Sequence, residues 1–131
     1  MSDTSNRPLV MLADDDVEIR RLLSLTLSSL DVDIIEAQDG EEALEMLIQH
    51  KPTLVVLDVM MPTLSGWEIC KYIRSKPTFS TTAVIMLTAI GRTVNEMTSP
   101  LYGADAYLDK PFDIDEMLTT VSGLLEKKAS P

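Results

Sequence analysis

The sequence predicts an α/β domain in which one parallel β-sheet lies between two layers of helices. Short runs that are apolar at every position recur along the chain, as is typical of strands buried on both faces of a parallel sheet. Between these runs the apolar residues change to helical spacing, so that strand and helix alternate five times. A helix that connects two parallel strands crosses over the sheet in a right-handed sense. We therefore expect a three-layer, doubly wound sheet of five strands with five helices.

Five segments are predicted as strands. Residues 9–13, 54–57 and 83–87 are apolar throughout and should lie inside the sheet. Residues 32–37 are more mixed, which suits an edge strand, and residues 106–108 are a short fifth candidate.

Apolar stripes at helical spacing separate these strands. They comprise Ile19, Leu22, Leu23, Leu27 and Leu30; Leu44, Leu47 and Ile48; Ile69, Cys70 and Ile73; and Ile114, Met117, Leu118, Val121, Leu124 and Leu125. Three helix starts are predicted by a capping residue with a glutamate three positions later, a pair that satisfies free amides: Asp39 with Glu42, Ser65 with Glu68, and Asp113 with Glu116. Residues 91–103 contain Pro100 between two glycines and predict only a short or irregular fourth helix.

The composition limits the class of protein. The length of 131 residues suits one domain. No apolar run approaches the ~20 residues of a membrane span and the start lacks a secretory signal, so we expect a cytoplasmic protein without membrane insertion. One cysteine and one histidine exclude an internal disulfide framework and a zinc cluster. The net charge of -10 argues against direct binding to nucleic acid.

Polar side chains follow four of the predicted strands. The first strand leads into three consecutive aspartates that begin at Asp14, the third into Asp58, the fourth into Thr88, and the fifth through Asp109 into Lys110. Because ligands bind beyond the carboxyl ends of parallel strands, these groups should meet at one edge of the sheet.

The carboxylates of this edge should repel one another strongly. Each pair costs about 4 kcal/mol at ~4 Å with an effective dielectric constant near 20, and one lysine cannot neutralise the cluster. The cluster should therefore either raise a carboxyl pKa or bind a divalent cation. Without histidine or cysteine nearby, a hard ion such as Mg²⁺ fits best.

The same groups suit phosphoryl transfer to an aspartate. Asp58 would be the nucleophile, the metal and Lys110 would neutralise phosphoryl oxygens, and Thr88 would donate a hydrogen bond to one of them. The motifs ADDD at 13–16, LDVMMP at 57–62, LTA at 87–89 and LDKPF at 108–112 together resemble the receiver domains of bacterial two-component response regulators, the CheY-like family.

This resemblance covers about residues 9–126, and the intervals between the motifs fit the family's spacing. It implies a flavodoxin-like sheet with strand order 2-1-3-4-5 and a receiver domain over residues 8–127. Residues 1–7 and 128–131 would be flexible tails.

The resemblance also implies roles for the site residues. Asp58 would accept a phosphoryl group from a histidine kinase or a histidine phosphotransfer protein. Asp15 and Asp58 would bind Mg²⁺ directly, Asp14 mostly through water, and Met60 through its backbone carbonyl. Lys110 would pair with phosphoryl oxygens, and its bond to Pro111 is usually cis in the family.

A switch is implied as well. Thr88 would move toward the phosphoryl group and Tyr107 would turn inward, which would alter the surface of the fourth helix, the fifth strand and the fifth helix. That surface would contact a downstream protein target or an output domain, and the chain would be a monomer or a weak, phosphorylation-dependent dimer. Met60 and Ile90, both apolar, would flank the phosphoryl group and limit access of the hydrolytic water.

Several of these residues also have simpler interpretations. Asp16 is more simply a helix cap or a solvated residue. His50 is expected to be solvated at a helix end, Cys70 to be an inert core thiol, and Trp67 to pack at the start of a helix. Met61 is expected to pack beneath the loop that follows Asp58.

Two other functions compete with the phosphoacceptor role. Phosphatases with an aspartyl nucleophile resemble a D-x-D-x-T/V pattern, but Met60 stands where their second aspartate acts as general acid. We therefore expect no enzyme activity beyond Mg²⁺-dependent self-phosphorylation and autodephosphorylation. The second alternative is a receiver-like interaction module that works without phosphorylation, against which the complete residue set argues.

Overall fold

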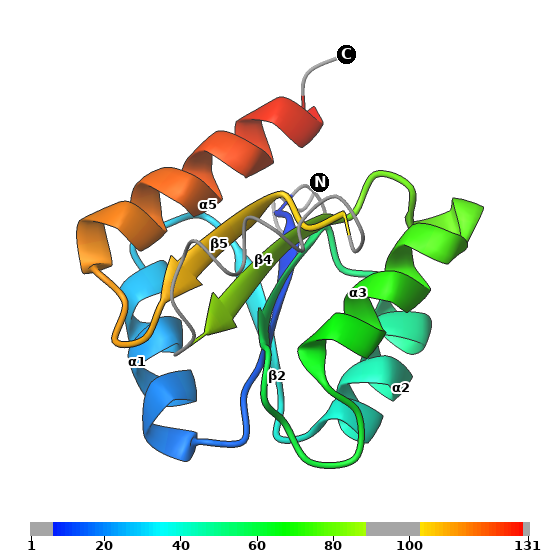
Figure 1. Ribbon diagram of the computed structural model, residues 1–131. Helices are drawn as coiled ribbons and strands as arrows, with labels where there is room; N and C mark the ends of the chain where they lie inside the picture. Colours follow the sequence, from blue (N-terminus) through cyan, green and yellow to red (C-terminus); the bar gives the residue numbers. More distant parts are fainter. Residues whose placement is uncertain (1–6, 89–102, 130–131) are drawn as a thin grey trace.

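The computed structural model describes residues 7–88 and 103–129, which form a five-stranded parallel sheet between two layers of helices (Figure 1). The strand order is β2-β1-β3-β4-β5, and every neighbouring pair is parallel. The predicted fold class and strand order are confirmed. The strands are β1 (Leu9–Ala13), β2 (Asp33–Ala37), β3 (Leu54–Asp58), β4 (Ala83–Thr88) and β5 (Ala106–Asp109).

The described residues form four α-helices and one short 3-10 helix. Helices α1 and α5 cover one face of the sheet, while α2 and α3 cover the other (Figure 1). The predicted fourth helix lies outside the described residues. The helices are α1 (Val17–Leu27), α2 (Gly40–His50), α3 (Gly66–Ser75), the 3-10 helix η2 (Pro77–Phe79) and α5 (Ile114–Ala129).

Each face of the sheet has its own hydrophobic core. One cluster packs α1 and α5 against alternate residues of the central strands, and it contains Val10, Val56 and Ile85. The intervening strand residues, such as Val55 and Val84, point into the second cluster with α2 and α3. All positions of β3 and β4 are buried, which explains why these runs are continuously apolar.

The capping predictions are confirmed at all three helix starts. The side chain of Asp39 accepts a hydrogen bond from the amide of Glu42 at 2.8 Å. Ser65 and Glu68 form a complete capping box at the start of α3. The third pair lies before α5, where the Asp113 carboxylate accepts from the amide of Glu116 at 2.9 Å.

The apolar stripes predicted more burial than the structure has. Leu22 on α1 is 40% exposed, Ile48 on α2 is 47% exposed and Ile114 on α5 is 51% exposed. Leu22 and Ile48 lie at the borders of their stripes and turn away from the sheet, whereas Ile114 is the first residue of α5. Strand β2 begins at Asp33, one residue later than predicted, although the side chain of Val32 is still buried in the core.

One arginine anchors the start of β5 to the neighbouring elements. The guanidinium group of Arg74, on α3, donates to the carbonyls of Gly103 at 2.7 Å and Thr82 at 2.9 Å, and to the Asp105 carboxylate at 2.9 Å. Asp105 also accepts from the amide of Val84 at 2.8 Å. This network fixes where β5 starts and so helps to place its far end beside β4.

In the described parts of the chain, no helix is long and apolar enough to span a membrane.

Candidate functional site

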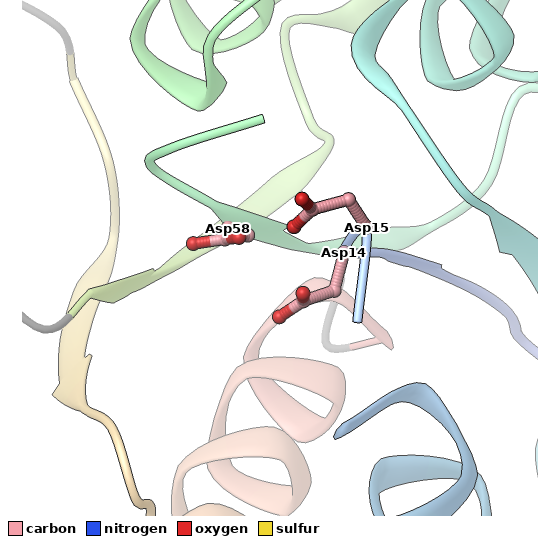
Figure 2. Close-up of side chains that lie close together, drawn as sticks. All are labelled: Asp14, Asp15 and Asp58. Atoms are coloured by element: carbon pink, nitrogen blue, oxygen red, sulfur yellow. The ribbon is translucent and has the colours of Figure 1, made fainter. Parts of the chain in front are cut away.

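Three aspartates meet at the carboxyl-terminal edge of the sheet. Asp14 and Asp15 follow β1, and Asp58 is the last residue of β3, the strand next to β1. Figure 2 shows their side chains close together. One carboxylate oxygen from each lies within 4.8 Å of the others. The predicted meeting of the carboxylates that follow β1 and β3 is therefore present.

Asp58 is held rigidly at the end of its strand. Its side chain is almost fully buried, and Oδ1 accepts a hydrogen bond from the amide of Met60 at 3.3 Å. The next residue, Val59, donates its amide to the carbonyl of Leu87 on β4 at 3.0 Å and accepts from the amide of Gly66 at 2.9 Å. The loop after β3 is thus tied to β4 and to the first residue of α3.

Asp14 is fully buried, whereas Asp15 is exposed. The Oδ1 atom of Asp14 accepts from the amide of Asp16 at 2.9 Å, and its backbone carbonyl accepts from the Arg20 guanidinium at 2.6 Å. Asp16 caps α1 by accepting from the amide of Glu18, as its simpler interpretation predicts.

Lys110 bridges the two buried carboxylates. Its Nζ atom lies 3.1 Å from Oδ2 of Asp14 and 3.3 Å from Oδ2 of Asp58. Its backbone amide donates to the carbonyl of Thr88, the last residue of β4, at 2.8 Å. The bond between Lys110 and Pro111 is cis, as the resemblance implies.

The site changes the proton affinity of its buried groups. Burial of the Asp58 carboxyl, reinforced by the negative charge of Asp14, raises its pKa to about 6, although Lys110 and the Met60 amide oppose this shift. Burial acts to lower the pKa of Lys110, but hydrogen bonds and charge from Asp14 and Asp58 outweigh burial and raise it. Lys110 is therefore a permanent cation at neutral pH.

The cluster has the chemistry of a hard-cation site. Carboxylate oxygens from three residues converge, while Lys110 supplies a single positive charge. The raised pKa of Asp58 shows that this lysine does not fully compensate the burial and the neighbouring charge. A divalent ion with oxygen ligands would remove the remaining imbalance, so the residues fit Mg²⁺.

Thr88 and Tyr107 lie on adjacent strands near this edge. Thr88 is 1% exposed at the end of β4, and Tyr107 lies on β5 opposite Met86. The ring of Tyr107 contacts the ring of Trp67, in the first turn of α3, with centroids 5.9 Å apart and an interplanar angle of 44°. Residue 89, which follows Thr88 in the LTA motif, lies outside the described residues.

The simpler interpretations of the surrounding residues agree with the structure. Cys70 is buried, and burial raises the pKa of its thiol to about 11. His50 is exposed in the last turn of α2, and Met61 packs against the core on the α2 and α3 side.

Sequence reasoning missed two residues that shape the site. Arg20 holds the carbonyl of Asp14 and pairs with Glu36 of β2 at 3.2 Å. Gly66 allows α3 to start against the backbone of Asp58, because a Cβ atom at this position would collide with the Asp58 carbonyl. A glycine directly after the Ser65 cap is a signal that could have indicated such a close approach.

Comparison with known proteins identifies the family. The family model of the response regulator receiver domain matches residues 10–122. The chain therefore belongs to the response regulator receiver domain family.

Named relatives agree with this assignment. The chain is 39% identical over 126 residues to the probable transcriptional regulator ycf27 of Cyanophora paradoxa, covering 96% of this chain and 52% of that protein. It is 36% identical over 120 residues to the DNA-binding dual master transcriptional regulator RpaA of Synechocystis, covering 92% and 50%. The chain spans about half the length of these relatives.

Solved structures share the fold. The receiver domain of the Francisella response regulator 1452 is 35% identical with a TM-score of 0.85, and the match covers 92% of this chain and 98% of that domain. The chemotaxis response regulator CheY4 of Vibrio cholerae is 29% identical with a TM-score of 0.83, covering 90% and 98%.

Proposed function

We propose that Asp58 is the phosphoacceptor of this receiver domain and takes its phosphoryl group from a histidine kinase or a histidine phosphotransfer protein in an Mg²⁺-dependent reaction. One observation carries the proposal: at the end of a central strand, the Asp58 carboxylate lies 3.3 Å from the Lys110 ammonium group and close to the carboxylates of Asp14 and Asp15.

The two oxygens of Asp58 have different surroundings. Oδ1 accepts the amide of Met60, which holds the carboxylate in one orientation, and Oδ2 lies beside the Lys110 ammonium. The carboxylate attacks the phosphorus atom of the donor, a new oxygen–phosphorus bond forms, and the bond to the donor histidine breaks. Lys110 then pairs with a phosphoryl oxygen, and Thr88 donates its hydroxyl to another.

Asp14, Asp15, Asp58 and the backbone carbonyl of Met60 would hold the ion. When bound, Mg²⁺ supplies the positive charge that allows an anionic phosphoryl group to approach an anionic carboxylate. The chain's own contribution is orientation. Arg20 and the Asp16 amide fix Asp14, while the loop tied to β4 fixes Asp58.

We further infer that Thr88 and Tyr107 form the switch that carries the phosphorylation state to the surface of the fourth helix, β5 and α5. Their neighbouring strands and the packing of Tyr107 against Trp67 support this inference. Phosphorylation would favour one of two packings by the energy of the new contacts to Thr88 and Lys110.

The proposed partners are protein ones. We expect a downstream target or an output domain to read the switch surface, without direct binding of nucleic acid by this domain, and either a monomer or a weak dimer after phosphorylation. The names of the relatives indicate transcriptional regulation for those proteins. We propose that the domain is cytoplasmic, as its kinase would be. We also propose that the receiver domain extends from residue 8 to residue 127.

Acetyl phosphate tests the proposal directly. Incubated with Mg²⁺ and acetyl phosphate, the wild type should gain the mass of one phosphoryl group, whereas Asp58→Asn should gain none. Omission of Mg²⁺ should prevent the gain. Phosphorylation of Asp58→Asn to the same extent would refute the assignment, and no gain in either protein would favour the alternative, an interaction module that works without phosphorylation.

A further inference from the structure

Met60 is the most accessible sulfur-containing side chain in the described parts of the chain. It is 70% exposed, whereas Met11, Met86 and Met117 have no exposed surface. Two other methionines, Met46 and Met61, pack against the core on the α2 and α3 side. A dissolved oxidant therefore meets the Met60 thioether before it meets any of these five.

The cysteine does not compete with Met60 for an oxidant. Cys70 has no exposed surface, and burial keeps its thiol protonated by raising its pKa to about 11. Because peroxides react with the thiolate and require access, Cys70 is protected on both counts.

The position of Met60 ties its chemistry to the phosphoacceptor. Its amide donates to Oδ1 of Asp58 at 3.3 Å, so its backbone is fixed beside the carboxylate while its side chain extends into solvent. Its thioether is therefore an apolar, oxidisable group in solvent, on the residue whose amide contacts the Asp58 carboxylate.

We propose that Met60 is a site of reversible oxidation by peroxides and that its sulfoxide shortens the lifetime of the phosphoryl group on Asp58; the second part rests on the proposed function. The sulfur lone pair attacks one peroxide oxygen, the oxygen–oxygen bond breaks and a sulfur–oxygen bond forms. Sulfur is oxidised by two electrons, and hydrogen peroxide is reduced to water. A methionine sulfoxide reductase reverses the change with electrons from a thiol.

The sulfoxide changes what the side chain does to water. Its oxygen is a strong hydrogen-bond acceptor, so an apolar side chain becomes one that binds water, two residues from the acyl phosphate. Hydrolysis needs a water molecule in line with the phosphorus–oxygen bond. Oxidation of Met60 therefore links peroxide exposure to faster loss of the signal.

The test compares each protein with itself before and after mild treatment with hydrogen peroxide. Peptide mapping by mass spectrometry should find the added oxygen on Met60 ahead of the buried methionines. Phosphorylated with acetyl phosphate at saturating Mg²⁺, the oxidised wild type should dephosphorylate about threefold faster or more. A methionine sulfoxide reductase should restore the original rate.

Two variants isolate the sulfur atom. Met60→Leu should show no change of rate on peroxide treatment, which also controls for oxidation of methionines outside the described residues. Met60→Gln should decay rapidly with or without peroxide. Oxidation of Met60 without a change in rate, or an equal change in Met60→Leu, would overturn the inference while leaving the proposed function intact. A reduced protein that takes up no phosphoryl group would overturn both.

Discussion

The surroundings of Asp58 oppose its charge in the absence of metal. Its carboxylate is buried beside Asp14, and Lys110 has to serve both anions at 3.1 and 3.3 Å. A pKa raised from 3.8 to about 6 corresponds to an unfavourable free energy of about 3 kcal/mol for the ionised form in the folded state. The proposed phosphoacceptor therefore lies where the fold disfavours its ionised form.

Replacement of Asp58 by asparagine should therefore stabilise the metal-free domain. At neutral pH, Asp58→Asn removes one buried charge and leaves Lys110 paired with Asp14 alone, so the free energy of unfolding should rise by about 1–2 kcal/mol. Urea unfolding with a chelator measures this. Asp16→Asn is the matched control and should change little, since asparagine also caps helices. A less stable Asp58→Asn would show that the carboxylate is well compensated.

The side chain of Met60 should control the lifetime of the phosphoryl group. Met60→Asn places a polar group that can hold water next to Asp58, and dephosphorylation should accelerate by about threefold to tenfold. Decay of phosphorylated protein, followed after removal of acetyl phosphate, gives the rate. Met60→Leu, which stays apolar, should decay slowly like the wild type. An unchanged rate in Met60→Asn would mean that this side chain does not limit access of water.

At the scale of elements, the junction between β3 and α3 sets the site geometry. Gly66 starts α3 in contact with the carbonyl of Asp58, and the Cβ of an alanine there would also press on Met86. Gly66→Ala should lower the free energy of unfolding by about 2–4 kcal/mol, because the backbone of Asp58 cannot move away from the added methyl group without disrupting β3. It should also slow phosphorylation by displacing Asp58.

A second glycine provides the control for this prediction. Gly123, in α5, has open space where a Cβ would be, so Gly123→Ala should stabilise the domain by about 0.5–1 kcal/mol through helix propensity. Thermal or urea unfolding of both variants measures the contrast. Equal effects of the two substitutions would mean that the close approach at Gly66 has no energetic consequence.

The packing of Trp67 against Tyr107 should be a measurable coupling between α3 and β5. A double-mutant cycle with Trp67→Leu and Tyr107→Leu should give an interaction free energy of about 0.5–1.5 kcal/mol, as expected for tilted aromatic rings. Trp67→Leu combined with Val121→Ala, which lies in the core on the other face of the sheet, should be additive. Additive effects of Trp67→Leu and Tyr107→Leu would argue against a role for Trp67 in the proposed switch.

The strands and the residues that directly follow them could be predicted from the sequence, because both depend only on neighbouring positions in the chain. Continuous apolar runs identified the strands, and the residues directly after them, Asp14, Asp58 and Thr88, had to reach one edge once the strands were parallel. Lys110 was predicted on the same basis, one residue beyond β5. Strand ends are therefore the most predictable part of this candidate site.

Contacts between distant elements could not be predicted in the same way. The hydrogen bond from Arg20 to the Asp14 carbonyl and the ring contact of Trp67 with Tyr107 depend on how far one layer lies from the next. Helical periodicity gives the direction of a stripe but not its width, which is why Leu22 was expected inside and is 40% exposed. The spacing of the layers is set by the whole core.

At the scale of the molecule, folding and ion binding are linked through the acidic edge. Asp58 has a higher pKa in the folded state than its ordinary value, so its contribution to stability is fully present below about pH 4 and is lost as the pH rises through about 6. An ion that binds the ionised cluster instead adds stability as the pH rises. The two effects should therefore make the stabilisation by Mg²⁺ strongly dependent on pH.

Mg²⁺ should raise the melting temperature near neutral pH. It should have little effect below about pH 5, where Asp58 is protonated and protons compete with the ion. At a hundred times its dissociation constant, a ligand adds about 2.7 kcal/mol to the free energy of unfolding. Thermal unfolding with and without Mg²⁺ across this pH range tests the linkage. Asp15→Asn removes an exposed ligand without disturbing the pairing of Lys110 with the two buried carboxylates, so it should lose the Mg²⁺ effect while remaining folded. If Mg²⁺ stabilised the wild type equally at both ends of the range, or Asp15→Asn as much as the wild type, the ion would be binding somewhere other than this edge of the sheet.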